Sequence, residues 1–202
     1  MGSGEWGVET KLPVYILAGG KSSRFGSDKA RALLNGEALV ARIVRVLGPV
    51  AVNFTAVANV SDKYIDLKIR TIADERAELG PMGGLLTSLR DAPSPGWILL
   101  CSCDMVALDC GWVELLAAAR AKGSVAAGFK GERVEPLFAL YHTALLERVE
   151  RAIAAGQLSP AKLLEESGAK LLALPPNWPR HAHVNTPEEL AECEREFTRK
   201  TE

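Results

Sequence analysis

The chain has 202 residues, of which 48% are hydrophobic, and its formal net charge at pH 7 is −1. This composition predicts a sizeable core within one domain, and the small charge excludes a general electrostatic affinity for nucleic acid or anionic membranes. No apolar run reaches the roughly 18 to 20 residues of a membrane span, and the start of the chain lacks the apolar centre of a signal peptide. We expect a cytoplasmic protein, with residues 1–12 as a disordered terminus or an expression remnant and residues 13–200 as the domain.

A short apolar run, Val-Tyr-Ile, predicts a first buried strand, and a glycine-rich, basic segment follows it. At Gly19 and Gly20, backbone N–H groups can converge on an anion without obstruction by Cβ atoms. Lys21, Arg24 and Lys29 add positive charge where a triphosphate would lie. The spacing fits neither the dinucleotide-binding glycine motif nor the P-loop, so a purely structural turn is the alternative interpretation.

The rest of the chain alternates between strand and helix patterns. In the first half we expect a helix over 38–47, strands over 50–58 and 68–72, a helix over 85–90 and a strongly apolar strand over 97–101. In the second half we expect strands over 125–127 and 170–174, a proline-interrupted extended run over 133–141, and helices over 143–155, over 159–167 and after Thr186. Thr186 and Glu189 have the spacing of a capping box. The alternation predicts an α/β fold, a Rossmann-like three-layer sandwich with a mostly parallel central sheet.

Two aspartates follow predicted strands of this sheet. Asp74 comes shortly after the strand at 68–72, and Asp104 after the strand at 97–101. Ligands of such sheets bind at the carboxyl ends of the strands, so these residues and the glycine-rich loop predict one nucleotide site. From position alone, Asp104 is equally a ligand for a hard cation such as Mg²⁺ or a cap for the next turn. Asp74 can also be a solvated carboxylate without a function.

The cysteines and histidines show no metal-binding pattern. The spacing of the cysteines matches no zinc site, and we expect reduced, structural thiols at Cys101, Cys103, Cys110 and Cys193. His181 and His183 are expected to be surface or packing residues, because no metal-binding carboxylate or cysteine accompanies them in the sequence.

The segment from Leu17 to Lys29 closely resembles the opening signature of the MobA-like nucleotidyltransferases, which include molybdenum cofactor guanylyltransferase. In that family Leu-Ala-Gly-Gly leads through a basic residue to Met-Gly and then Asp-Lys; here Phe25 stands in place of the methionine and remains large and apolar. Other segments of the chain also resemble the family in the expected order. They are the Asp before Gly-Pro-x-x-Gly (Asp74), the Cys-x-Cys-Asp segment (Asp104), Glu-Pro-Leu (Glu135) and Asn-Thr-Pro-Glu (Asn185). The family often has a proline two residues after the Asp, where this chain has Val106.

The resemblance implies a fold of the nucleotide-diphospho-sugar transferase type and transfer of GMP from GTP to the terminal phosphate of molybdopterin, with Mg²⁺ as cofactor and pyrophosphate as the leaving group. It also implies transient contact with molybdenum-cofactor insertion proteins or acceptor enzymes. The first alternative is a related cytidylyl- or sugar-phosphate nucleotidyltransferase. The second is a carrier that binds nucleotide or molybdopterin without turnover.

The resemblance also assigns roles to individual residues. The catalytic residues are Arg24 and Lys29, which face charge developing on pyrophosphate, and Asp104, which binds Mg²⁺ with Asn185 in the metal's shell. Asp74 contacts the nucleoside, whereas Asn59 is at least as well explained as a turn former. The expected nucleotide-binding residues are Leu17, Ala18, Gly19, Gly20, Lys29, Asn59, Asp74, Gly80, Gly84 and Asp104.

Overall fold

The computed structural model describes residues 11–19, 25, 28–120, 123–179 and 182–199. The strands of its main sheet are β1 (Leu12–Leu17), β4 (Ala51–Ala58), β5 (Arg70–Ala73), β6 (Trp97–Ser102), β7 (Ala126–Lys130), β8 (Val134–His142) and β9 (Lys170–Ala173). A small hairpin consists of β2 (Leu33–Leu34) and β3 (Glu37–Ala38). The helices are α1 (Leu39–Leu47), α2 (Pro81–Asp91), α3 (Cys110–Ala118), α4 (Leu146–Ala154), α5 (Pro160–Glu166) and α6 (Pro187–Arg199).

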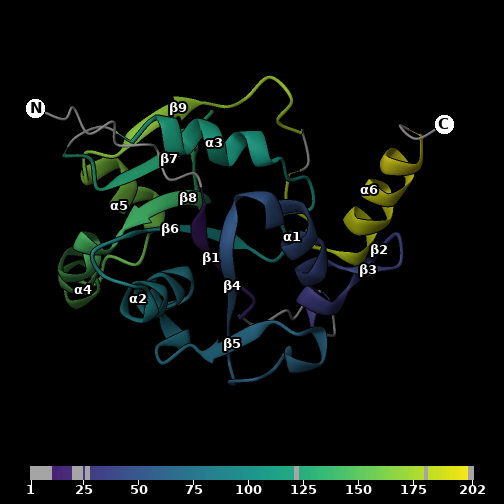
Figure 1. Cartoon of the computed structure of the whole chain (residues 1–202), viewed down its shortest axis with the longest axis horizontal. Coiled ribbons are helices and arrows are strands. Elements are labelled where there is room, and N and C mark those ends of the chain that lie inside the picture. Colours follow the sequence, from purple (N-terminus) through teal and green to yellow (C-terminus); the bar gives the residue numbers. More distant parts are fainter. Residues whose placement is uncertain (1–10, 20–24, 26–27, 121–122, 180–181, 200–202) are drawn as a thin grey trace, which may run out of the picture.

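The main sheet has the strand order β5-β4-β1-β6-β8-β7-β9 (Figure 1). Strand β8 runs antiparallel to both of its neighbours, and the other neighbouring pairs are parallel. The carboxyl ends of the six mutually parallel strands therefore lie on one edge of the sheet, together with the amino end of β8. This arrangement confirms the predicted mostly parallel sheet.

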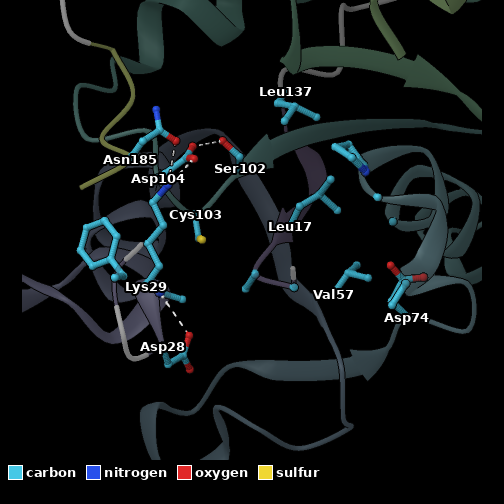
Figure 2. Close-up of a pocket in the computed structure, with 18 residues that line it drawn as sticks. Leu17, Asp28, Lys29, Val57, Asp74, Ser102, Cys103, Asp104, Leu137 and Asn185 are labelled. Carbon is cyan, nitrogen blue, oxygen red and sulfur yellow. Dashed lines mark hydrogen bonds and ion pairs between the residues drawn. The ribbon is translucent and has the colours of Figure 1, made fainter. Parts of the chain in front are cut away.

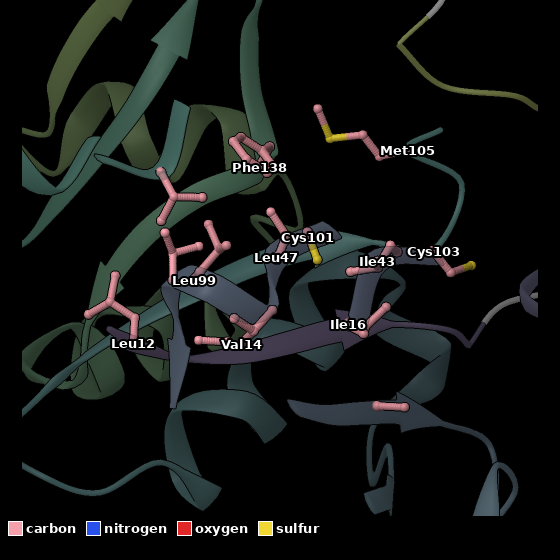
Figure 3. Packing of buried hydrophobic residues seen from close by; sticks show 14 of the residues in the cluster. Leu12, Val14, Ile16, Ile43, Leu47, Leu99, Cys101, Cys103, Met105 and Phe138 are labelled. Carbon is pink, nitrogen blue, oxygen red and sulfur yellow. The ribbon is translucent and has the colours of Figure 1, made fainter. Parts of the chain in front are cut away.

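Apolar side chains leave both faces of the sheet and pack against helices, because successive residues of a strand point to opposite sides. On one face, Val14 and Ile16 of β1 lie in one cluster with Ile43 and Leu47 of α1 (Figure 3). Tyr15 belongs to a second cluster, which α2, α4 and α5 complete on the other face. The two clusters give the predicted three layers.

Helix α6 extends away from the sheet and lies beside the β2–β3 hairpin (Figure 1). Its buried residues Leu190 and Cys193 share a small cluster with Leu34, Val106 and Val184. This third cluster joins the end of the described chain to the region that follows β6.

The structure corrects the sequence-based expectations at several points. Strand β1 begins at Leu12, inside the segment assigned to the terminus, because the Leu12 side chain is buried in the core. Pro136 lies inside β8 rather than interrupting it, at the irregularity in the β7–β8 pairing where a ladder donor is dispensable. Helix α2 begins earlier than expected, at Pro81, and α3 was not predicted at all.

All four cysteines are free thiols, as expected. Burial raises the pKa of the Cys103 thiol to about 12, so this group is neutral at ordinary pH. None of the helices in the described part of the chain combines the length and apolar character that crossing a membrane requires.

Candidate functional site

A pocket of about 430 Å³ opens at the edge of the sheet where β1, β4, β5 and β6 end (Figure 2). Polar groups lie at two sides of this pocket. Lys29, Asp104 and Asn185 meet on one side, Asp74 lies on the other, and Leu17 is between them. The pocket has the size and the mixed lining of a small-molecule site.

Asp104 is the centre of the first group. Its Oδ2 accepts a hydrogen bond from the Lys29 ammonium at 2.7 Å, and the same ammonium donates to Asn185 Oδ1 at 3.2 Å. The Ser102 hydroxyl donates to the other oxygen, Oδ1. Burial alone would raise the pKa of Asp104, but its hydrogen bonds outweigh burial and hold that pKa well below the ordinary range. The carboxylate is therefore ionised across the physiological range.

Backbone pairing brings these distant residues together. Val106 donates its N–H to the Ala182 carbonyl and Val184 donates to the Asp104 carbonyl, both at 3.0 Å. The buried side chains of Val106 and Val184 fix this pairing in the third cluster. The capping prediction is confirmed at Thr186, whose hydroxyl accepts from the Glu189 N–H, but the Glu189 carboxylate accepts from the Asn185 N–H instead of completing the box. The start of α6 thus anchors Asn185 at the pocket.

His183 lies in the site and not on a bare surface, which corrects the sequence-based expectation. Its Nδ1 is 3.0 Å from Asp104 Oδ1, and its Nε2 is 3.4 Å from Glu135 Oε2. Burial opposes protonation of the imidazole, yet the two carboxylates outweigh it and raise the pKa of His183 to about 9. The metal-free site therefore contains two cations, Lys29 and His183, around one buried carboxylate. The only sequence signal for His183 was its position two residues before Asn185.

Tyr64, which the sequence analysis did not single out, holds the segment that presents Lys29. Its hydroxyl donates to the Asp28 carboxylate at 3.1 Å and lies 3.4 Å from the Ala18 carbonyl oxygen. Asp28 caps the short 3₁₀ turn Lys29–Arg31 by accepting from the Ala30 N–H, and the Lys63 ammonium lies 3.1 Å from it. Because the Tyr64 side chain is fully buried, this contact fixes the loop after β1 relative to the turn that carries Lys29.

On the opposite side, Asp74 is oriented through one oxygen. Its Oδ1 accepts from the Arg76 N–H at 3.0 Å and from the Thr87 hydroxyl at 3.1 Å. Among the described residues no donor bonds its second oxygen, Oδ2, so a carboxylate lone pair is available to a ligand. Asp74 and the start of α2 therefore form the second polar wall of the pocket.

The predicted glycines of this wall differ in role. Gly80 has φ +60°, which favours glycine, and open space where a side chain would project. A Cβ on Gly84 would lie 2.7 Å from the Leu17 side chain. Glycine is therefore needed here for packing against Leu17, whether or not a ligand also approaches. Gly83, which was not predicted, has even less space for a side chain, because an added Cβ would come within 2.2 Å of the Arg76 carbonyl oxygen.

The remaining predicted residues fall into three groups. Ala18 and Gly19 line the pocket beside Leu17. Asn59 is exposed in the bend after β4 and is not among the residues that line the pocket, so its predicted contact with the nucleotide stays a prediction. Gly20 and Arg24 lie outside the described residues, as do Lys21 and His181.

The oxygen atoms around the Lys29 ammonium suit a hard cation. Asp104 Oδ2 and Asn185 Oδ1 converge on one positively charged group, and a divalent ion such as Mg²⁺ takes carboxylate and amide oxygens together with phosphate oxygens and water. The described residues contain no cluster of three or more His, Cys, Asp or Glu side chains able to hold a metal. A metal here would thus be held jointly by the chain and its substrate.

The model of the MobA-like NTP transferase domain family matches residues 14–171. A Deinococcus radiodurans protein named probable molybdenum cofactor guanylyltransferase is 38% identical over 185 residues, which cover 90% of this chain and 93% of that protein. A Pseudomonas paraeruginosa protein named molybdenum cofactor guanylyltransferase is 34% identical over 183 residues, covering 88% of this chain and 92% of that protein.

A solved structure shows the same fold. The crystal structure of molybdopterin-guanine dinucleotide biosynthesis protein A from Archaeoglobus fulgidus matches with a TM-score of 0.78 at 22% sequence identity, covering 93% of this chain and 100% of that one. The predicted Rossmann-like three-layer sandwich with a mostly parallel central sheet is therefore confirmed.

The environment of His183 predicts a titration that NMR can follow in metal-free protein. Replacing Asp104→Asn should lower the pKa of His183 from about 9 toward its ordinary 6.5, because the imidazolium loses an anionic partner. The control Asp66→Asn removes a carboxylate that pairs with Arg31 and should leave the titration unchanged. An unchanged pKa in Asp104→Asn would contradict the geometry.

The same shift predicts a pH dependence of stability. Since the pKa of His183 is raised on folding, its contribution to the free energy of unfolding is complete below about pH 6.5 and is lost as the pH rises through about 9. Urea unfolding of the wild type and of His183→Gln should therefore differ more at pH 6 than at pH 10.

Proposed function

Since the chain belongs to the MobA-like NTP transferase domain family, we propose that it transfers GMP from GTP to the terminal phosphate of molybdopterin and forms the guanine dinucleotide cofactor. The observation that carries the proposal is the convergence of Lys29, Asp104 and Asn185 at one side of a pocket at the carboxyl edge of the sheet. The names of relatives that match most of the chain support the choice of both substrates.

The reaction needs positioning and charge neutralisation more than proton transfer. An oxygen of the acceptor phosphate attacks the α-phosphorus of GTP, and a new P–O bond forms. The bond from the α-phosphorus to the bridging oxygen breaks, and its electron pair leaves with pyrophosphate. A phosphate nucleophile is already ionised near neutral pH, so no dedicated general base is required.

The chain's own residues supply the positioning. In this proposal the backbone at Ala18 and Gly19 binds the triphosphate, and the free oxygen of Asp74 accepts a hydrogen bond from the nucleoside. Lys29 stabilises negative charge on the departing pyrophosphate, with Arg24 as its expected companion. Fixed donors and cations aimed at developing charge are the main source of rate in such reactions.

Asp104 and Asn185 would hold the metal, and we propose Mg²⁺ because the donors are hard oxygens in small number. The bound ion would neutralise phosphate charge and help to align the triphosphate. Lys29, which pairs with Asp104 in the metal-free chain, would then be released toward the phosphates. Ser102 and His183 would keep the Asp104 carboxylate ionised and oriented.

Pyrophosphate release in Mg²⁺ tests the proposal, with GTP, CTP or ATP supplied with and without molybdopterin. The expected result is release that is selective for GTP and requires molybdopterin. Selectivity for CTP, or release driven by a sugar phosphate, would assign the chain to another nucleotidyltransferase activity. Tight nucleotide binding without release under any pairing would indicate a carrier.

Asp104→Ala should abolish metal-dependent turnover while the chain remains folded. Removing the carboxylate that pairs with Lys29 should lower kcat by about a hundredfold or more, the scale typical of lost charge stabilisation. The matched control is Glu150→Ala, which removes a carboxylate paired with Arg90 outside the pocket. Circular dichroism verifies folding, and unchanged turnover in Asp104→Ala would rule out the metal assignment.

Tyr64→Phe tests the positioning of Lys29. The variant keeps the buried ring but loses the hydroxyl that joins Asp28 to the loop after β1, so kcat/KM for GTP should fall about tenfold, the equivalent of one charge-assisted hydrogen bond. Tyr15→Phe is the matched control, because it removes a tyrosine hydroxyl bonded to Asp91 outside the pocket. Equal kinetics in the two variants would show that the Tyr64 hydroxyl does not position the site.

A further inference from the structure

A second hollow, of about 470 Å³, opens at the same edge of the sheet, and none of the roles assigned above involves it. Two segments form it: the turn between β7 and β8, and the stretch that follows β9. Its walls include Glu132, Arg133, Glu135, Leu174 and Trp178.

The strand order places this hollow on the other side of Asp104 from Leu17 and Asp74, and the nucleotide pocket reaches toward it as far as Leu137 of β8. Leu17, Val57 and Asp74 of that pocket belong to β1, β4 and the end of β5, whereas Asp104 follows β6. The hollow lies at β8, β7 and β9, which come next in the order (Figure 1). Along this edge of the sheet, the nucleotide pocket comes first, the charged group around Asp104 comes next, and the second hollow follows.

Side-chain contacts connect the hollow to the charged centre. Glu135, which lines the hollow, has its Oε2 3.4 Å from His183 Nε2, and the other imidazole nitrogen is 3.0 Å from Asp104. A molecule seated in the hollow would therefore lie one imidazole away from the carboxylate at the centre of the site.

The lining combines a flat apolar wall with unpaired charges. The Trp178 indole is partly buried and stacks on Trp112 with ring centroids 4.5 Å apart, so its orientation is fixed. Glu132 and Arg133 are exposed, and neither side chain hydrogen-bonds or ion-pairs with any described residue. Arg31, Arg70 and Arg90, in contrast, all form ion pairs.

We propose that this hollow binds the ring system of the acceptor, an inference that rests on the proposed function. The fitting ligand is an organic phosphate that carries a flat, nitrogen-rich heterocycle. Trp178 and Leu174 contact the ring, the Glu132 carboxylate accepts from ring N–H groups, and the Arg133 guanidinium donates to a ring carbonyl or nitrogen. The phosphate of the same molecule then extends past Glu135 toward Asp104, where it meets the α-phosphorus of the nucleotide.

Steady-state kinetics of two exposed-residue variants test this assignment in the full-length protein. In Arg133→Gln and in Glu132→Gln, the KM for molybdopterin should rise about tenfold, the scale of one hydrogen bond to a charged group, while the KM for GTP stays unchanged. Arg151→Gln, which alters an exposed arginine on α4, is the matched control and should change neither constant.

The outcomes distinguish a failure of the acceptor-site proposal from a failure of the proposed function. If the wild type makes product and both variants keep its KM for molybdopterin, the hollow is not the acceptor site, although the proposed function stands. If the wild type releases no pyrophosphate with any acceptor, the proposed function fails. Calorimetry with molybdopterin alone then tests whether the hollow binds this molecule. Weaker binding by Arg133→Gln than by Arg151→Gln supports the site, and equal binding overturns it.

Discussion

The backbone pairing of residues 104–106 with residues 182–184 is the contact on which the candidate site depends. Asp104 follows β6, which the sheet holds on both sides, but Asn185 and His183 lie in the connection before α6, and this pairing brings them to Asp104. Two main-chain hydrogen bonds and the burial of Val106 and Val184 join these segments in the interior of the third cluster. Packing of α6 against the β2–β3 hairpin therefore has a consequence at the pocket, since it holds the chain that supplies the amide oxygen facing Lys29.

This pairing brings several charged side chains together in a partly buried site, where each charge has a partner of opposite sign. Asp104 would be costly to bury alone, but it lies between the Lys29 ammonium and the His183 imidazolium, and Glu135 partners the second of these cations. The arrangement is satisfied internally: in the described part of the chain no buried side-chain nitrogen or oxygen lacks a partner. A ligand that brings a divalent cation and phosphates can exchange with Lys29 without leaving Asp104 uncompensated.

Local sequence patterns predicted the parts of this site that local structure determines. Lys29 and Asp104 follow strands in recognisable segments, and the sheet order then brings them to one edge. Tyr64 and His183 could not be predicted, because each acts through a partner that is far away in the chain and adjacent only after folding. Helix α3 was not predicted for another reason: its sequence, Cys-Gly-Trp-Val-Glu-Leu-Leu-Ala-Ala, is almost uniformly apolar and lacks the polar–apolar period of an amphipathic helix.

The antiparallel strand β8 explains why a second hollow exists beside the reaction centre. In a fully parallel sheet, the connection after β7 would cross a face and return at the opposite edge. Because β8 runs against its neighbours, the short turn between β7 and β8 remains at the carboxyl edge, where it presents Glu132 and Arg133 beside the end of β9. The same reversal places Glu135, near the amino end of β8, next to His183. One change of strand direction thus supplies the walls of the hollow and links them to Asp104, which a two-substrate transferase requires of neighbouring sites.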